Sequence, residues 1–160
     1  MSTRKGQSVA AGALKGAAAS LIGGLVLRAV WGAGQGLLPA NEKLPSPTGE
    51  TVKKLAEKRG VTLSSGQQQA ATLGMYGAVM LGWGAVFGAA QARFSPPLLA
   101  SSLALGGWIY ALNFPKATGV LPKTGVLKPP GEQTTGQAAV PIAAHAAFGL
   151  ATAAAYRVLD

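Results

Sequence analysis

The chain has 160 residues, which is room for one domain, and its 14 basic and 5 acidic side chains give a net charge of +9. Hydrophobic residues make up 49% of the chain and charged residues only 12%, which excludes an ordinary soluble domain. Gly and Ala supply much of the chain and aromatic residues make up only 6% of it, so the large side chains that fill a soluble core are scarce. Cysteine is absent, which excludes disulfides and thiolate metal sites. The composition predicts an integral membrane protein.

The basic residues are scattered singly through loops and chain ends, without interleaved aromatic residues. This pattern does not favour a nucleic-acid partner, and anionic headgroups of membrane lipids are the expected counter-charge. Arg4 and Lys5 precede an apolar run, as they would in a secretory signal. Because the run continues past the usual length of such a signal, we expect a retained helix.

The first predicted helix covers about residues 8–38, which is longer than the ~20 residues that a straight span needs. Small residues recur at every fourth position along it, and residues four apart lie on one helix face. The members are Gly12, Gly16, Ser20, Gly24, Arg28, Gly32 and Gly36. Such a face lets another helix approach closely, which is how helices associate in lipid. Arg28 is the one large member of this series.

A polar connection follows the first helix, and within it residues 50–59 carry Val52, Leu55 and Ala56 on one face among basic side chains. This pattern predicts a short amphipathic helix at the membrane surface, and a solvated loop helix fits it equally well.

Three more apolar helices are expected over about residues 69–92, 97–114 and 137–159. In the second helix, Ala70, Gly74, Ala78 and Gly82 repeat the four-residue spacing, so we expect this face to pack on the first helix. The stretch 116–136 contains three prolines and no apolar period, and we expect it to be irregular.

These elements predict an all-α, polytopic membrane protein, a four-helix bundle with GxxxG-type packing and both termini on one side. The long loops hold more Lys and Arg than the ends, which favours cytoplasmic loops. The early charges Arg4 and Lys5 favour cytoplasmic termini instead.

Several segments resemble the YagU-like family of small bacterial inner-membrane proteins. The resemblance rests on Arg28 to Pro47, on the stretch Asn113-Phe114-Pro115-Lys116-Ala117-Thr118-Gly119-Val120-Leu121-Pro122, and on Ala144-His145. Ala144 stands where the family pattern has glycine, and Gln35 where it has an acidic residue. The resemblance implies four spans in a bacterial inner membrane with cytoplasmic termini, and it implies no activity.

Every acidic residue lies outside the four expected spans, at Glu42, Glu50, Glu57, Glu132 and Asp160. A carboxylate pair or a cation cage at mid-membrane is therefore excluded for this chain alone. Arg28 consequently has no ionic partner within the spans. It either reaches lipid phosphate near the interface or faces a helix seam, where it binds an anion or a partner's carboxylate.

His145 is the only histidine, and no second histidine or cysteine exists to complete a metal site. We expect a helix-to-helix hydrogen bond, to Tyr110, Asn113, Thr72 or a backbone carbonyl, and no cofactor. A single axial bond to haem is the alternative.

The sequence thus predicts a non-catalytic structural or accessory subunit, which packs against itself or against other membrane protein subunits. The alternative is a transporter or carrier for an anionic or amphipathic small molecule, with Arg28 and His145 along the path.

Overall fold

The computed structural model describes residues 8–159, and within this range it contains helices and no strand. The all-helical prediction is therefore confirmed. The elements are α1 (Val9–Leu37), η1 (Ala40–Glu42), α2 (Pro47–Lys58), α3 (Ser65–Phe94), α4 (Leu98–Asn113), α5 (Val120–Lys123), η2 (Pro130–Glu132) and α6 (Thr135–Val158).

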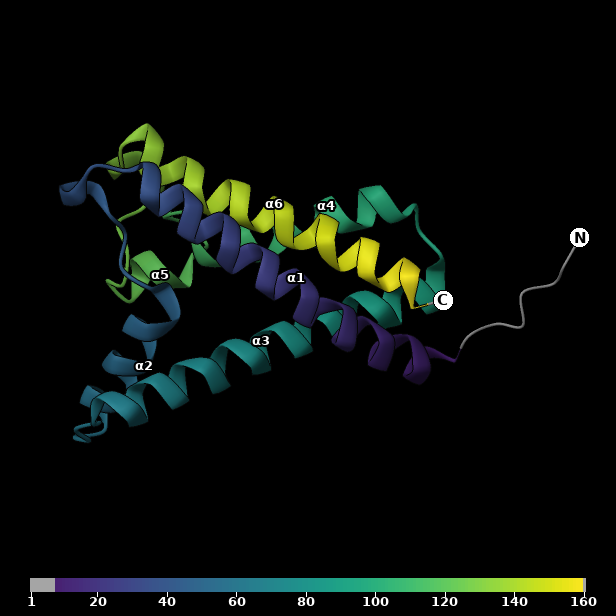
Figure 1. The fold of residues 1–160 in the computed structure, drawn as a ribbon, viewed down its shortest axis with the longest axis horizontal. Coiled ribbons are helices and arrows are strands. Elements are labelled where there is room, and N and C mark those ends of the chain that lie inside the picture. Colours follow the sequence, from purple (N-terminus) through teal and green to yellow (C-terminus); the bar gives the residue numbers. More distant parts are fainter. Residues whose placement is uncertain (1–7, 160) are drawn as a thin grey trace, which may run out of the picture.

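The four longest helices run alternately toward and away from one end of the molecule (Figure 1). The start of α1 and the end of α6 lie at one end, and α2 and α5 lie at the other. α1 packs on both α3 and α6, while α4 packs mainly on α6. The helices therefore follow the spatial order α3, α1, α6, α4.

Within residues 8–159, three helices are long and apolar enough to cross a membrane, namely α1, α3 and α6. α4 has only 16 residues. At 1.5 Å per residue it is about 24 Å long, which is shorter than the hydrocarbon layer of roughly 30 Å.

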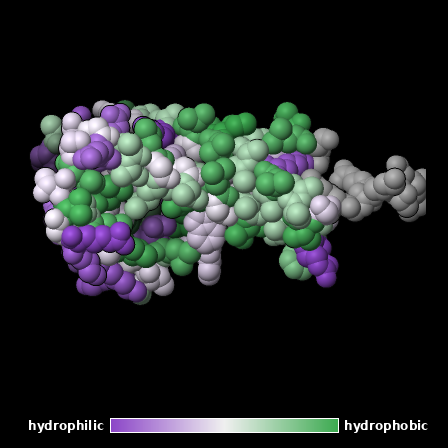
Figure 2. Space-filling model, turned by 90° about the horizontal axis from the view of Figure 1, so that it is seen from below, coloured by the Kyte–Doolittle hydropathy of each residue, from purple (hydrophilic) through white to green (hydrophobic). Residues whose placement is uncertain are grey.

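The outward faces of these helices are apolar. Leu14 and Leu25 on α1, Val86 on α3 and Leu99 on α4 are more than half exposed. Figure 2 shows most of the hydrophilic residues at the end that holds α2 and α5, a few at the opposite end, and a mainly hydrophobic surface between them. A contiguous apolar surface of this kind is typical of contact with lipid.

Side-chain caps explain why two helices begin earlier than predicted. The hydroxyl oxygen of Ser64 accepts a bond from the Gln67 amide, and the Gln67 side chain accepts one from the Ser64 amide. This capping box starts α3 at Ser65 instead of residue 69. Thr134 and Gln137 form the same box, so α6 starts at Thr135 instead of 137.

The two connections at the loop end are more ordered than predicted. Ser46 caps α2, with Pro47 in its first turn, so this helix begins before residue 50, and its Val52 is buried. The stretch 116–136 is not irregular throughout, because it contains α5 and η2. Its apolar residues Leu121, Val126 and Leu127 pack with Phe114 in a small cluster, which their uneven spacing concealed.

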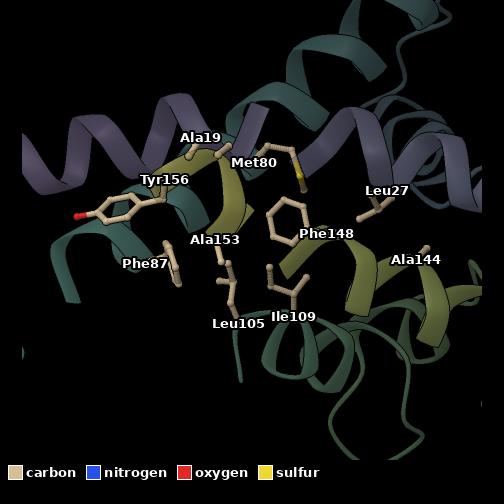
Figure 3. Packing of buried hydrophobic residues seen from close by; sticks show 11 residues of the cluster. Ala19, Leu27, Met80, Phe87, Leu105, Ile109, Ala144, Phe148, Ala153 and Tyr156 are labelled. Atoms are coloured by element: carbon tan, nitrogen blue, oxygen red, sulfur yellow. The ribbon is translucent and has the colours of Figure 1, made fainter. Parts of the chain in front are cut away.

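The main core lies where α6 meets the other long helices (Figure 3). Phe148 is fully buried there and packs among Leu27, Met80 and Ile109, from α1, α3 and α4. One aromatic side chain of α6 thus lies where three other helices meet.

Candidate functional site

Small residues form the crossing of α1 and α3. A Cβ added at Gly16 would overlap the Gly84 carbonyl oxygen, and one at Gly88 would overlap the Gly12 carbonyl oxygen. Ser20 lies in the same crossing, and its hydroxyl donates to the carbonyl oxygen of Met80 at 2.8 Å. Here the two backbones approach as closely as glycine allows.

The face of α3 in this crossing differs from the predicted one. An added Cβ at Gly74 or Gly82 would meet no atom of the described residues within 4 Å, and the same holds for Gly32 and Gly36 on α1. The predicted contact of these glycines with a neighbouring helix of the chain is therefore wrong. For Gly74 and Gly82 the physical reason is the face of the helix: α3 meets α1 through Tyr76, Met80, Gly84 and Gly88, and a shift of two positions turns a helix by about 200°. Gly32 and Gly36 lie where α1 and α3 have diverged beyond the crossing.

Further small residues that the sequence analysis missed form the crossings of α6. Gly23 of α1 lies against Thr152 and Phe148, Gly106 of α4 against the His145 carbonyl oxygen, and Gly149 against the Ser102 carbonyl oxygen. Among the predicted glycines, Gly24 lies near the side chains of Met80 and Tyr76. The i, i+4 pair Gly84 and Gly88 was a readable signal in the sequence.

The divergence of α1 and α3 leaves a cavity of about 810 Å³. α2 closes one side of it, and residues of α4, α5 and α6 line the rest. This volume is in the range of small-molecule sites, which is roughly 300–1,000 Å³. Among the predicted site residues, Arg28, Gly32, Asn113 and His145 line it, and Tyr110 does not.

Arg28 lies on α1 at the wall of this cavity and is exposed. Its guanidinium carbon is 5.8 Å from the ring centroid of Tyr76, a cavity residue that the sequence analysis did not single out. The Tyr76 hydroxyl donates to the Gly24 carbonyl oxygen at 2.5 Å, which fixes the ring beside Arg28. No acidic side chain of residues 8–159 forms an ion pair with Arg28.

His145 is 8% exposed and belongs to an aromatic cluster. Its Nδ1 lies 2.7 Å from the Pro141 carbonyl oxygen, so Nδ1 carries the hydrogen and donates to that oxygen. The rings of Phe114 and Tyr110 lie edge-on to it at 5.3 and 6.1 Å. The histidine bond thus stays within α6, because Pro141 is one turn before it.

Asn113 also bonds within its own helix, through Nδ2 to the Ile109 carbonyl oxygen at 2.7 Å. Tyr110 stacks on Phe114 with 5.1 Å between centroids. Of the four residues Arg28, His145, Tyr110 and Asn113, the rings of Tyr110 and His145 are neighbours, and no hydrogen bond between described residues joins any two of the four.

The cavity lining changes in polarity along α3. Its first turns contribute Ser65, Gln68 and Thr72, and the later turns contribute Met75 and Val79. None of the described residues that line the cavity is acidic. The cavity therefore combines one cationic group with a polar part and an apolar part.

Within residues 8–159, no three His, Asp or Glu side chains come together as a metal site. Comparisons with protein-family models, with curated proteins and with solved structures find no match for this chain. The similarity to the YagU-like family thus stays a prediction, and a function for this chain has to be inferred from its geometry.

Proposed function

We propose that this protein is a non-catalytic membrane protein of a bacterial inner membrane, and that it acts as a structural or accessory subunit. The proposal rests on the outward face of α3. In its apolar 18-residue stretch, α3 has only 22% of its residues buried, compared with 39% for the same length of α1 and 44% for that of α6. A helix with this much free surface is suited to packing against a further helix.

We further propose that α4 is a fourth span, although it is short. It runs beside α6, and Gly106 and Gly149 bring the two helices close together. A short span is tolerated when the bilayer thins locally or when flanking residues reach the interface. In this arrangement the start of α1 and the end of α6 share one side of the membrane.

The free face of α3 has the spacing that helices use to associate in lipid. Ala70, Gly74, Ala78 and Gly82 are four residues apart and are all exposed. The crossing of α1 and α3 is built from the same kind of face, with glycine backbones in contact. A second copy of α3 therefore offers a matching surface, and a homo-oligomer joined through α3 is the simplest assembly.

Size measurement in mild detergent tests this proposal. The wild-type chain should form a discrete assembly larger than a monomer, and Gly74→Leu combined with Gly82→Leu should shift it toward the monomer. Gly36→Leu is the matched control, since Gly36 is equally open but lies on α1. A monomeric wild-type protein, or equal effects of both sets of substitutions, refutes the proposal.

The second candidate is a carrier for an anionic or amphipathic small molecule, and the cavity beside Arg28 favours it. A carrier requires Arg28 to contact the cargo, so Arg28→Ala should abolish uptake of anionic amphiphiles into vesicles and leave the assembly intact. Uptake that does not change in this variant removes the candidate.

A further inference from the structure

We propose that the cavity between α1, α2 and α3 binds one anionic phospholipid, with the phosphate group at Arg28 and one acyl chain along the apolar part of α3. Residues of α1, α2, α3, α4, α5 and α6 line this site. It is also separate from the free face of α3, since Ala70, Gly74, Ala78 and Gly82 do not line it.

The charge of the cavity selects an anion. Arg28 is its single formal charge, and none of the described lining residues is acidic. A guanidinium within a membrane-spanning helix is costly unless another group compensates it. Tyr76 supplies a ring face at 5.8 Å but no negative charge, so compensation has to come from outside the described part of the chain. A guanidinium binds a phosphate group through two parallel hydrogen bonds.

The polarity of the walls selects an amphipath over a small inorganic anion. On the α2 side, Ser46, Thr48 and Thr51 continue the polar part formed by the first turns of α3. Beyond Tyr76, the lining consists of Val79, Met80 and residues such as Leu27 and Ile109. A headgroup suits the first part and a hydrocarbon chain suits the second.

The rim of the cavity provides access from the bilayer. Leu73 and Val79 line the cavity and are also 49% and 42% exposed. Both belong to α3, a helix long and apolar enough to span the membrane. A lipid can therefore enter sideways while its second chain remains among neighbouring lipids. Phospholipid is consequently the source of phosphate that the location favours.

Native mass spectrometry of the full chain, released from bilayers of mixed phosphatidylglycerol and phosphatidylcholine, tests this site. The wild-type protein should retain one phosphatidylglycerol, with a preference of about tenfold or more, as expected for charge-assisted hydrogen bonds. Arg28→Gln should remove this preference. Arg93→Gln is the matched control and should retain it, since Arg93 lies at the far end of α3 and does not line the cavity.

A second variant keeps the charge and fills the apolar part. Val79→Trp should displace the acyl chain and lower phosphatidylglycerol retention although Arg28 is intact, so the test remains decisive even if Arg28→Gln fails to fold. Three results would overturn the site: wild-type retention in Val79→Trp, equal losses in Arg28→Gln and Arg93→Gln, or release of the lipid by excess inorganic phosphate. The last result would identify a free-anion site.

Discussion

Glycines with the same spacing have different roles at different positions of α1. Gly16 touches the backbone of α3, whereas an added Cβ at Gly36 meets no described atom within 4 Å. Both lie in α1, and each has another small residue four positions away, so the spacing does not distinguish one from the other. The difference is the distance to the neighbouring helix, which only the crossing determines.

Gly16→Ala should therefore destabilise the protein by about 1–3 kcal/mol, because the methyl group forces the helices apart. Gly36→Ala should be neutral or stabilising by up to about 1 kcal/mol, because alanine favours the helix. Thermal unfolding of both variants in detergent measures the difference. Equal stabilities would contradict the described crossing.

Two buried hydroxyl groups should respond in opposite directions to removal. Ser20 donates to the Met80 carbonyl oxygen, and Ser20→Ala should cost about 0.6 kcal/mol, the average for such bonds in membrane proteins. Thr152 Oγ1 is buried without a hydrogen-bond partner among the described residues. Thr152→Val keeps the shape of the side chain and should be neutral or stabilising. A loss in Thr152→Val comparable to that in Ser20→Ala would show that Thr152 has a partner.

Along α3, one helix carries three different surfaces. Its C-terminal half docks on α1 through Gly84 and Gly88, its N-terminal half lines the cavity through residues such as Thr72 and Tyr76, and its small-residue face is free. The start of the helix decides whether Ser65 and Gln68 belong to the cavity wall. The capping box at Ser64 therefore positions part of the cavity wall, although Ser64 and Gln67 do not line the cavity.

Ser64→Ala should lower the stability of the protein by about 1 kcal/mol, because the Gln67 amide loses its acceptor. Ser65→Ala is the control, since no cap depends on that side chain. Chemical unfolding in detergent gives both values. If the two substitutions have the same effect, the capping box does not hold the first turn of α3.

For the assembled bundle, the number of spans can be tested because the chain has no cysteine. If α4 crosses the membrane, Lys53→Cys and Lys123→Cys lie on one side and Arg93→Cys on the other. A membrane-impermeant maleimide added to sealed vesicles of one orientation should then label both Lys53→Cys and Lys123→Cys, or neither of them. Labelling of Lys123→Cys together with Arg93→Cys would instead mean that α4 enters and leaves on the same side.

Composition and apolar run length were sufficient to predict the helical, membrane-type character of this chain. Helices and their approximate limits follow from local residues, since each span needs its own backbone bonds and an apolar surface. The contacts of Gly84, Gly88 and Gly23, and the open surroundings of Gly74 and Gly82, needed the three-dimensional arrangement. They depend on which of two four-residue series of α3 faces α1 and on where the two antiparallel helices cross, and the spacing itself determines neither. The cavity beside Arg28 arises in the same way, because α1, α2 and α3 enclose it from distant parts of the chain.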